Sequence, residues 1–178
     1  FESFKNHVSV LFWSLGNESY AGDILVEMNR YYKEKDPDRL VHYEGVAENR
    51  PYEDLISDME SQMYASPEKI KEYLENNPKK PFILCEYMHD MGNSLGGMES
   101  YIRLLDQYED YQGGFIWDYI DQALFVKDEV TGRDVLRYGG DFDDRPSDYE
   151  FSGNGILFAD RTEKPAMQEV RHYYGLRR

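Results

Sequence analysis

The stretch PFILCEY (residues 81–87) carries the strongest strand pattern in the chain, because a run of apolar residues leads directly to a glutamate. A continuous apolar run of this kind is typical of a strand that is covered on both faces of a parallel sheet. The stretch LFWSLGNESY (11–20) has the same order, with apolar residues first and then Asn17 and Glu18. Both stretches predict buried strands whose ends present polar side chains.

Strand patterns and helix patterns alternate along the rest of the chain. We expect strands at 7–15, 40–45, 60–65, 81–87 and 113–119, and helices at 21–35, 67–76, about 98–108 and from Pro165 onward. Ser66 should cap the helix that begins at Pro67, since serine followed by proline is a common helix start. Because the alternation contains no hairpin signal, it predicts a parallel α/β sheet.

Polar residues gather at the expected carboxyl ends of these strands. They are Asn17, Glu18, Glu44, Tyr64, Glu86, Trp117 and Asp118. A (β/α)8 TIM barrel builds its active site at this end of its strands. A doubly wound nucleotide-binding sheet needs a Gly-x-Gly-x-x-Gly turn, which this sequence lacks. The pattern therefore favours the barrel.

The barrel is expected to be incomplete. A closed one needs eight strands, whereas this sequence offers five, so we expect approximately strands 4–8 over residues 1–178. A buried-looking strand follows Phe1 almost at once, which predicts a segment of a larger protein. The long irregular stretch at 120–164 is interpreted as a lid or binding loop.

Composition excludes several classes of partner. The chain has 20 basic and 35 acidic residues, a net charge of −15, and this balance argues against binding to nucleic acid or to an anionic membrane. A single cysteine rules out an intramolecular disulfide and a cysteine-based metal cluster. Strand alternation puts Cys85 on the face opposite Glu86. We interpret Cys85 as a small apolar filler packed outward beneath a helix, on a face that offers no partner histidine.

The two strand-end glutamates, Glu18 and Glu86, suggest a specific chemistry. A buried carboxylate without a partner is costly, so a purely structural strand seldom ends inward on one. Two carboxylates at one barrel mouth suit glycosidic bond cleavage, in which one protonates the leaving oxygen and the other attacks or activates water. A separation of about 5–5.5 Å gives retention, and about 6.5–9.5 Å gives inversion. The alternative is that each glutamate anchors a helix or a neighbouring arginine.

Four long motifs carry a resemblance to a known family. They are SVLFWSLGNES (9–19), FILCEYMHDMGNSLGG (82–97), GGFIWDYIDQ (113–122) and YGGDFDDRPSDYEFSGNGILFADRT (138–162). Together they resemble the second half of the barrel domain of β-galactosidases of glycoside hydrolase family 2, from about His7 to Tyr174. The resemblance to β-glucuronidases and β-mannosidases of that family is weaker. It implies hydrolysis of terminal non-reducing β-D-galactose by double displacement, with retention and a covalent galactosyl-enzyme.

The resemblance implies roles for three residues in the reaction itself. Glu18 matches the acid/base, protonated before the reaction and ionised once the sugar is attached to the enzyme. Glu86 matches the nucleophile. Asn17 matches the amide that hydrogen-bonds the sugar 2-hydroxyl, a contact that strengthens in an oxocarbenium-like transition state.

Three further residues match substrate-binding positions. Tyr64 matches a tyrosine beside the nucleophile, His89 a histidine that contacts sugar hydroxyls, and Trp117 the aromatic wall under the galactose ring. Without the surrounding motifs, His89 would be interpreted as a residue at the beginning of a helix. A lone tryptophan such as Trp117 would more often belong to the core.

Two metal ions also follow from the resemblance. Magnesium would be bound by Glu18 together with ligands expected upstream of Phe1. Sodium would be bound by the backbone oxygen of Phe151 and the side chain of Asn154, together with an aspartate expected upstream of Phe1. Hard cations need several oxygen ligands, so each shell is only half present in these residues.

The leading hypothesis is a retaining β-galactosidase acting on a β-galactoside such as lactose. The alternatives are a non-catalytic piece of such an enzyme, a β-glycosidase of the same family with another sugar preference, and a lectin-like sugar binder. An open sheet of five strands leaves two edges, which predicts self-association into a homo-oligomer.

Overall fold

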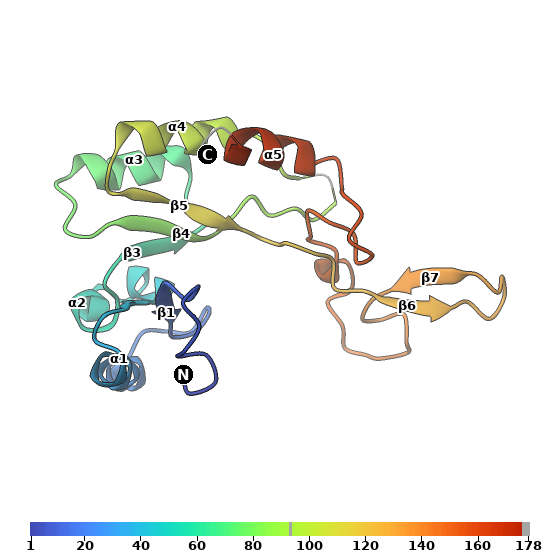
Figure 1. Ribbon diagram of the computed structural model, residues 1–178, viewed down its shortest axis with the longest axis horizontal. Coiled ribbons are helices and arrows are strands. Elements are labelled where there is room, and N and C mark those ends of the chain that lie inside the picture. Colours follow the sequence, from blue (N-terminus) through green and yellow to red (C-terminus); the bar gives the residue numbers. More distant parts are fainter. Residues whose placement is uncertain (93, 176–178) are drawn as a thin grey trace. The chain divides into compact units, whose positions relative to one another are not determined.

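A computed structural model describes residues 1–92 and 94–175. The chain forms two compact units, which are described separately (Figure 1). Unit 1 consists of Phe1–Cys85 and Leu104–Gly114, and unit 2 consists of Glu86–Arg103 and Phe115–Arg178.

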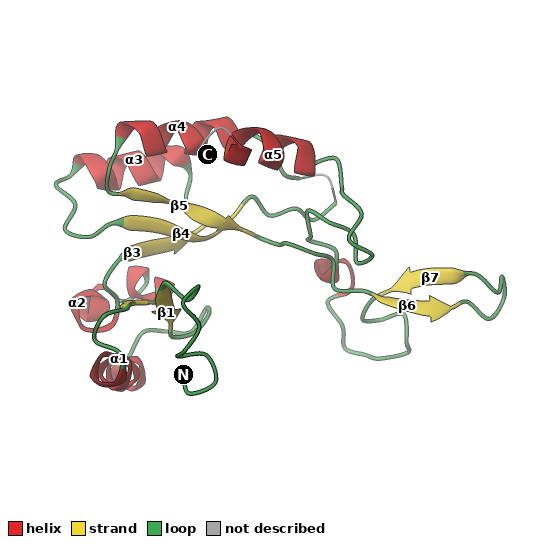
Figure 2. Ribbon diagram, in the orientation of Figure 1, coloured by secondary structure: helices red, strands yellow, loops and turns green. Residues whose placement is uncertain are grey.

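The five expected strands and four expected helices are present with adjusted ends (Figure 2). The strands at these positions are β1 (Phe12–Ser14), β2 (Leu40–His42), β3 (Glu60–Met63), β4 (Phe82–Tyr87) and β5 (Tyr111–Ile116). The expected helices are α1 (Asp23–Lys35), α3 (Pro67–Glu75), α4 (Met98–Gln107) and α5 (Met167–Gly175). Additional short elements are η1 (Glu44–Ala47), η2 (Arg50–Tyr52), α2 (Glu53–Ile56) and η3 (Tyr149–Ser152).

The sheets are partial. β1 and β2 pair in parallel with Trp13 opposite Val41, and a second sheet has the order β3-β4-β5. Over the described residues the sheets have two, three and two strands and none closes into a barrel. β1 is shorter than the expected strand at 7–15, because the preceding residues form turns in which Val10 N–H donates to His7 O (3.1 Å).

The core of unit 1 lies between α1 and the β1–β2 pair. Its buried members are Trp13, Leu15, Ala21, Leu25, Val41, Tyr43, Val46 and Ile56. Polar contacts close its edges: Trp13 Nε1 donates to Asp36 Oδ2 (3.0 Å), and Val41 N–H donates to Asp58 Oδ2 (2.7 Å). The loops that follow β1 and β2 therefore begin at a well-packed core.

The expected helix start at Ser66 is confirmed. The Ser66 hydroxyl accepts from Lys69 N–H, and Pro67 occupies the first turn of α3. α3 buries Ile70 and Leu74, and the Tyr73 ring packs against Phe82 of β4 at a centroid distance of 5.3 Å. Amphipathic spacing and the N-cap thus account for this helix.

Unit 2 has its own core of Met98, Ile156, Leu157 and Val170. Glu169 Oε1 of α5 accepts from Met98 N–H at the beginning of α4 (2.8 Å), which satisfies a helix N-terminal donor. The hydroxyls of Tyr87 and Tyr174 lie 2.8 Å apart. These contacts hold the end of β4 beside α5.

The expectation that no hairpin is present was wrong. β6 (Leu124–Lys127) and β7 (Asp134–Arg137) pair antiparallel within the stretch interpreted as a lid (Figure 1). The turn is built by Asp128, whose Oδ1 accepts from both the backbone N–H and the hydroxyl of Thr131. Gly132 follows at φ +67°. An Asp-based turn followed by glycine is the signal that the alternation argument overlooked.

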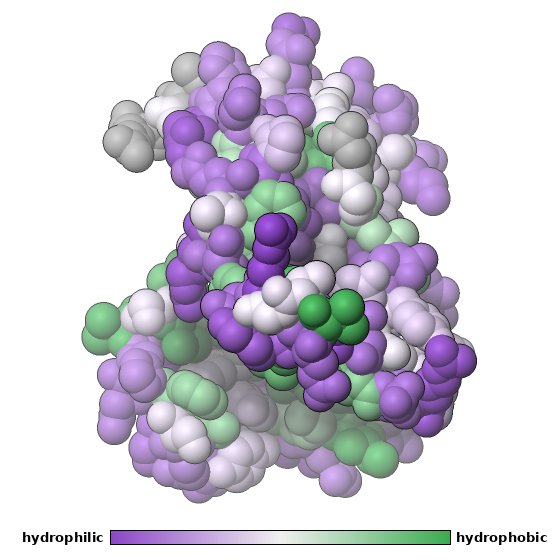
Figure 3. Space-filling view, turned by 90° about the vertical axis from the view of Figure 1, so that its right-hand side faces the viewer, coloured by the Kyte–Doolittle hydropathy of each residue, from purple (hydrophilic) through white to green (hydrophobic). Residues whose placement is uncertain are grey.

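Hydrophobic side chains reach the surface among hydrophilic ones on the face drawn in Figure 3. On the β6–β7 hairpin, for example, Leu124 and Phe125 are exposed. Among the described residues, no helix has the length and apolar character needed to cross a membrane.

Candidate functional site

The loop that follows β1 carries Asn17 and Glu18, and both side chains are exposed. Glu18 has φ +53°, a left-handed conformation that costs a non-glycine residue about 1–3 kcal/mol unless its surroundings hold it. A hydrogen bond holds this conformation: Glu18 N–H donates to Glu44 Oε1 at 2.6 Å. Because the acceptor is a carboxylate at the beginning of η1, this bond is charge-assisted and among the stronger kind.

A second contact fixes the same loop. The Tyr43 hydroxyl donates to the backbone oxygen of Ser19, and Tyr43 is fully buried in the unit 1 core. A Cβ added at Gly45 would lie 2.6 Å from Ser19 O and 2.6 Å from the Tyr43 ring. Gly45 is therefore required for the close approach of the Glu18 loop to the end of β2.

A cavity of about 600 Å³ opens beside this loop in unit 1. Its lining is mostly polar and carries both charges: Glu18, Ser19, Tyr20, Glu44, Gly45, Ala47, Glu48, Arg50, Gln62, Met63 and Lys69. Such a lining suits a ligand rich in hydroxyl groups. Tyr64, exposed at the end of β3 with φ +52°, and Asn17 do not contribute to the lining.

Glu44 is a site residue whose role the sequence did not reveal. It is buried, with 7% of its surface exposed, and it begins η1 rather than ending a strand. Its position after an apolar strand was a usable signal, but its contact with the Glu18 backbone depends on how β1 and β2 pair.

His42 is the last residue of β2, two residues before Glu44. It is 4% exposed, its Nδ1 lies 2.9 Å from Ser14 Oγ, and its buried Nε2 has no hydrogen-bond partner. Burial lowers the pKa of His42 to about 4, so the ring is neutral near pH 7.

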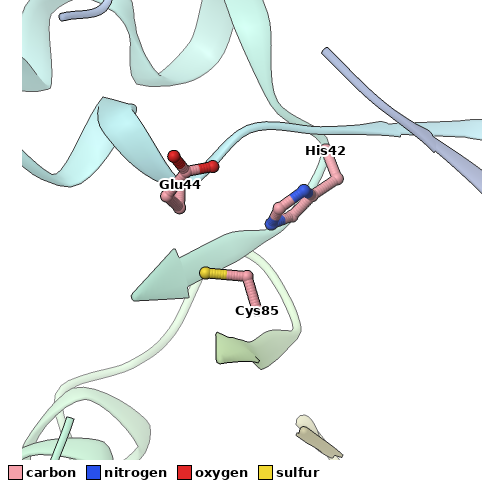
Figure 4. A group of neighbouring side chains, drawn as sticks. All are labelled: His42, Glu44 and Cys85. Carbon is pink, nitrogen blue, oxygen red and sulfur yellow. The ribbon is translucent and has the colours of Figure 1, made fainter. Parts of the chain in front are cut away.

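The expectation that the face carrying Cys85 offers no partner histidine was wrong. Its sulfur, a His42 ring nitrogen and a Glu44 carboxylate oxygen all lie within 4.8 Å of one another (Figure 4). Strand alternation predicts which face of β4 carries Cys85, but it does not predict which element lies opposite that face. The opposite element is β2, which contributes His42.

The remaining candidate residues lie in unit 2. Glu86 is half-buried and is the last residue but one of β4, and Met88, just beyond the strand, has φ +54°. The rings of His89 and Phe151 meet edge to face at a centroid distance of 6.0 Å. Unit 2 thus brings His89 together with Phe151, while Glu18 and Glu86 belong to different units.

Trp117 lies just beyond β5 and is held by its backbone. Its N–H donates to Tyr87 O (2.9 Å), and its carbonyl accepts from Asp90 N–H (2.9 Å). The peptide bond between Trp117 and Asp118 is cis. The indole is only half-buried, so it is not enclosed as a core tryptophan would be.

Asp90 is a buried carboxylate that the sequence argument did not single out. It is 1% exposed, its Oδ2 has no hydrogen-bond partner, and burial raises the pKa of its carboxyl group. Among charged groups, Lys164 has the largest electrostatic effect on the Asp90 carboxyl, and Lys164 already pairs with Asp121 at 2.7 Å.

The two proposed sodium ligands lie together. Asn154 Nδ2 donates to Phe151 O at 2.5 Å, and Asn154 Oδ1 is buried without a partner. Rotation of this amide by 180° would direct both oxygens to one point, so these residues fit a hard cation in part.

Magnesium is less well supported by the donor set. Glu18 is exposed, and it lies outside the group formed by His42, Glu44 and Cys85. That group is the one cluster of three potential metal-ligating side chains found in residues 1–92 and 94–175.

Comparisons with known proteins agree with the fold described above. The model of the "Glycosyl hydrolases family 2, TIM barrel domain" matches residues 1–177. The β-galactosidase large subunits of Latilactobacillus sakei and Lactobacillus helveticus are 74% identical over 175 residues and 70% identical over 176 residues. These alignments cover 98% and 99% of this chain. The chain spans 28% of the length of each of these relatives.

Among solved structures, the Lactobacillus rhamnosus β-glucuronidase superposes with a TM-score of 0.59 at 18% identity. The match covers 97% of this chain and 33% of that protein. At this identity the likeness concerns the fold alone. The match to the family model over nearly all residues and the close relatives agree: this chain belongs to the TIM-barrel domain of glycosyl hydrolase family 2.

Proposed function

We propose that the protein carrying this chain hydrolyses terminal β-D-galactosides, lactose among them. The observation that carries the proposal is the 74% identity, over 98% of the chain, to a protein named β-galactosidase large subunit. Because the chain spans 28% of that relative, the activity is proposed for the whole protein. The chain would supply approximately strands 4–8 of its barrel.

Glu86 is proposed as the nucleophile and Glu18 as the acid/base of a retaining double displacement. Glu86 attacks the anomeric carbon while Glu18 gives its proton to the leaving oxygen, and Glu18 then takes a proton from the water that releases the sugar. The fixed backbone of Glu18, held at φ +53° by Glu44, supports an acid with a defined orientation.

Four residues are proposed to bind the sugar. Asn17 would hydrogen-bond the 2-hydroxyl, Tyr64 would lie beside the nucleophile, and His89 would contact ring hydroxyls. The half-buried indole of Trp117, fixed through both of its backbone polar groups, supports its role as a platform for the sugar face.

Two metal ions are proposed as well. Glu18 would be one ligand of Mg²⁺. Phe151 O would bind Na⁺ together with Asn154 Oδ1 once the Asn154 amide is rotated. A bound cation supplies positive charge that fixes and orients the oxygens around it. Chelation of Mg²⁺ and dialysis into a sodium-free buffer, each followed by return of the ion, test the two sites separately. Unchanged hydrolysis after complete removal of an ion would contradict its assignment.

Assembly with other subunits is proposed from the relatives' name, "large subunit". Formation of a homo-oligomer stays a prediction. Sedimentation at several concentrations distinguishes a stable homo-oligomer, a mixed complex and a monomer.

The roles of the two glutamates are tested by azide rescue in the whole protein. Removing the nucleophile with Glu86→Gly should abolish hydrolysis of nitrophenyl β-galactoside, and azide should restore turnover with α-galactosyl azide as the product. Removing the acid/base with Glu18→Gly should spare the covalent step for good leaving groups, and azide should then give the β-anomer. The anomer identifies which face of the sugar each side chain served.

The matched control is Glu27→Gln, an exposed glutamate on α1. It should retain normal turnover and give no azide product. Near-normal hydrolysis by Glu86→Gly, or the same anomer from both active-site variants, would contradict the assigned roles.

A further inference from the structure

Three side chains with different ligand atoms meet in unit 1. His42 comes from the end of β2, Glu44 from the beginning of η1, and Cys85 from β4. One nitrogen, one carboxylate oxygen and the sulfur all lie within 4.8 Å of one another. In Figure 4 the three side chains extend from separate strands and turns toward a common space.

An independent observation points to a ligand in that space. Only 4% of the surface of His42 is exposed, yet its Nε2 has no hydrogen-bond partner. Buried polar atoms are normally satisfied, so each exception needs a cause such as an ion. When Nδ1 carries the ring proton it donates to Ser14 Oγ, 2.9 Å away. That tautomer leaves the Nε2 lone pair available, which is how an outer hydrogen bond prepares a histidine for a metal.

We propose that His42, Glu44 and Cys85 bind a thiophilic divalent cation of the Zn²⁺ type. Zinc takes imidazole nitrogen, thiolate sulfur and carboxylate oxygen at about 2.0–2.3 Å, with water in the fourth position of an open site. Ligand atoms around such an ion lie about 3.3–3.8 Å apart in a tetrahedron. From separations of up to 4.8 Å, rotamer adjustments of about 1 Å bring them into place. The Cys85 thiol loses its proton to the solvent as the Zn–S bond forms.

Occupation of this site acts on the Glu18 loop. The Glu44 carboxylate that would bind the cation also accepts from Glu18 N–H at 2.6 Å. A cation on Glu44 withdraws negative charge from that carboxylate and weakens this hydrogen bond. Zinc therefore inhibits hydrolysis by loosening the residue proposed as acid/base; this consequence rests on the proposed function, whereas binding itself does not.

Binding is measured directly in the whole protein, with excess Mg²⁺ present to fill sites for hard cations. Titration with Co²⁺, which substitutes for zinc, should produce a sulfur-to-metal charge-transfer absorption at one equivalent. Cys85→Ser should abolish this absorption, because Cys85 supplies the sulfur of the proposed site. Zinc should compete with Co²⁺, and X-ray absorption of the zinc-loaded wild type should show one sulfur at about 2.3 Å and lighter ligands at about 2.0–2.1 Å.

Matched variants identify the other ligands. His42→Gln should weaken zinc binding by at least about tenfold, since even outer-shell partners are worth about 10–100-fold. His172→Gln, an exposed histidine on α5, should leave the affinity unchanged. If a variant does not fold, the absorption spectrum of the wild type still decides the proposal.

Two results would overturn the inference: a sulfur-free zinc shell in the wild type, or an unaltered Co²⁺ absorption in Cys85→Ser. Failure of the proposed function is recognised separately, as absence of galactoside hydrolysis in zinc-free wild type. If hydrolysis is present, zinc should inhibit the wild type and leave Cys85→Ser active. Inhibition that persists in Cys85→Ser would contradict the coupling through Glu44.

Discussion

Replacing Glu44 should impair proton transfer to the leaving group while sparing the rest of the reaction. Its Oε1 accepts from Glu18 N–H at 2.6 Å, and the carboxylate is 7% exposed. A hydrogen bond to a charged group contributes about 1.5–3 kcal/mol, and a neutral one about 0.5–1.5 kcal/mol. If the loss falls on the orientation of Glu18, Glu44→Ala lowers kcat/KM by about 10–100-fold, since about 1.4 kcal/mol corresponds to a factor of ten. Glu44→Gln, which keeps a neutral acceptor, should lose only about fivefold.

The assay compares kcat/KM for two galactosides with different leaving groups. Dinitrophenolate leaves without protonation, whereas the glucose of lactose needs a proton from the acid/base, proposed to be Glu18. The losses calculated for Glu44→Ala and Glu44→Gln should therefore appear with lactose and nearly vanish with the dinitrophenyl substrate. A general disturbance of the fold would lower both values together.

Glu27→Gln serves as the control, since this glutamate is exposed on α1 and should change neither substrate. Equal losses on both substrates in Glu44→Ala, or lactose hydrolysis at the wild-type rate, would refute the idea that Glu44 positions Glu18.

Three further predictions concern stability. Ser66→Ala removes the acceptor for Lys69 N–H and should destabilise α3 by about 1 kcal/mol. Amide hydrogen exchange in α3 should then become about fivefold faster, and unchanged exchange would contradict the capping role of Ser66. Gly155→Ala should lower the melting temperature markedly, because its Cβ would lie 2.4 Å from the backbone carbon of Ile120; a normal melting curve would contradict this crowding. The folded pKa of His42 is about 4, below the unfolded value of about 6.5. Its contribution to stability is therefore intact above pH 6.5 and lost as the pH falls toward 4. The wild type should lose about 3 kcal/mol more than His42→Gln across that window, measured by urea unfolding, and parallel pH profiles would refute it.

The sequence predicted local structure well wherever neighbouring residues determine it. Ser66 and Pro67 marked the start of α3 because capping depends on adjacent atoms. The apolar run at 81–87 marked β4 because continuous burial leaves a continuous pattern. The roles of Glu18 and Glu86 came from motif resemblance and stay predictions.

The errors and omissions concern relations between distant segments. Cys85 was assigned to a face without histidine, and the correction depends on His42 from another strand. Glu44 attracted attention as a polar residue after a strand, but its hydrogen bond to Glu18 spans 26 residues. No local pattern encodes such a pairing. The β6–β7 hairpin is different: its turn at Asp128 and Thr131 is local, and the signal was present in the sequence.

The peptide groups of Trp117 have a consequence for inhibitor design. The N–H of this residue donates to Tyr87 O, and its carbonyl accepts from Asp90 N–H. The backbone of this one residue therefore holds both ends of the segment from Tyr87 to Asp90, which directly follows Glu86. A compound that stacks on the indole and tilts it would carry this segment with it and change the direction of the Glu86 carboxylate. If Glu86 is the nucleophile as proposed, aromatic ligands that never touch it should act as mixed inhibitors of the proposed hydrolysis, with an effect on turnover as well as on affinity.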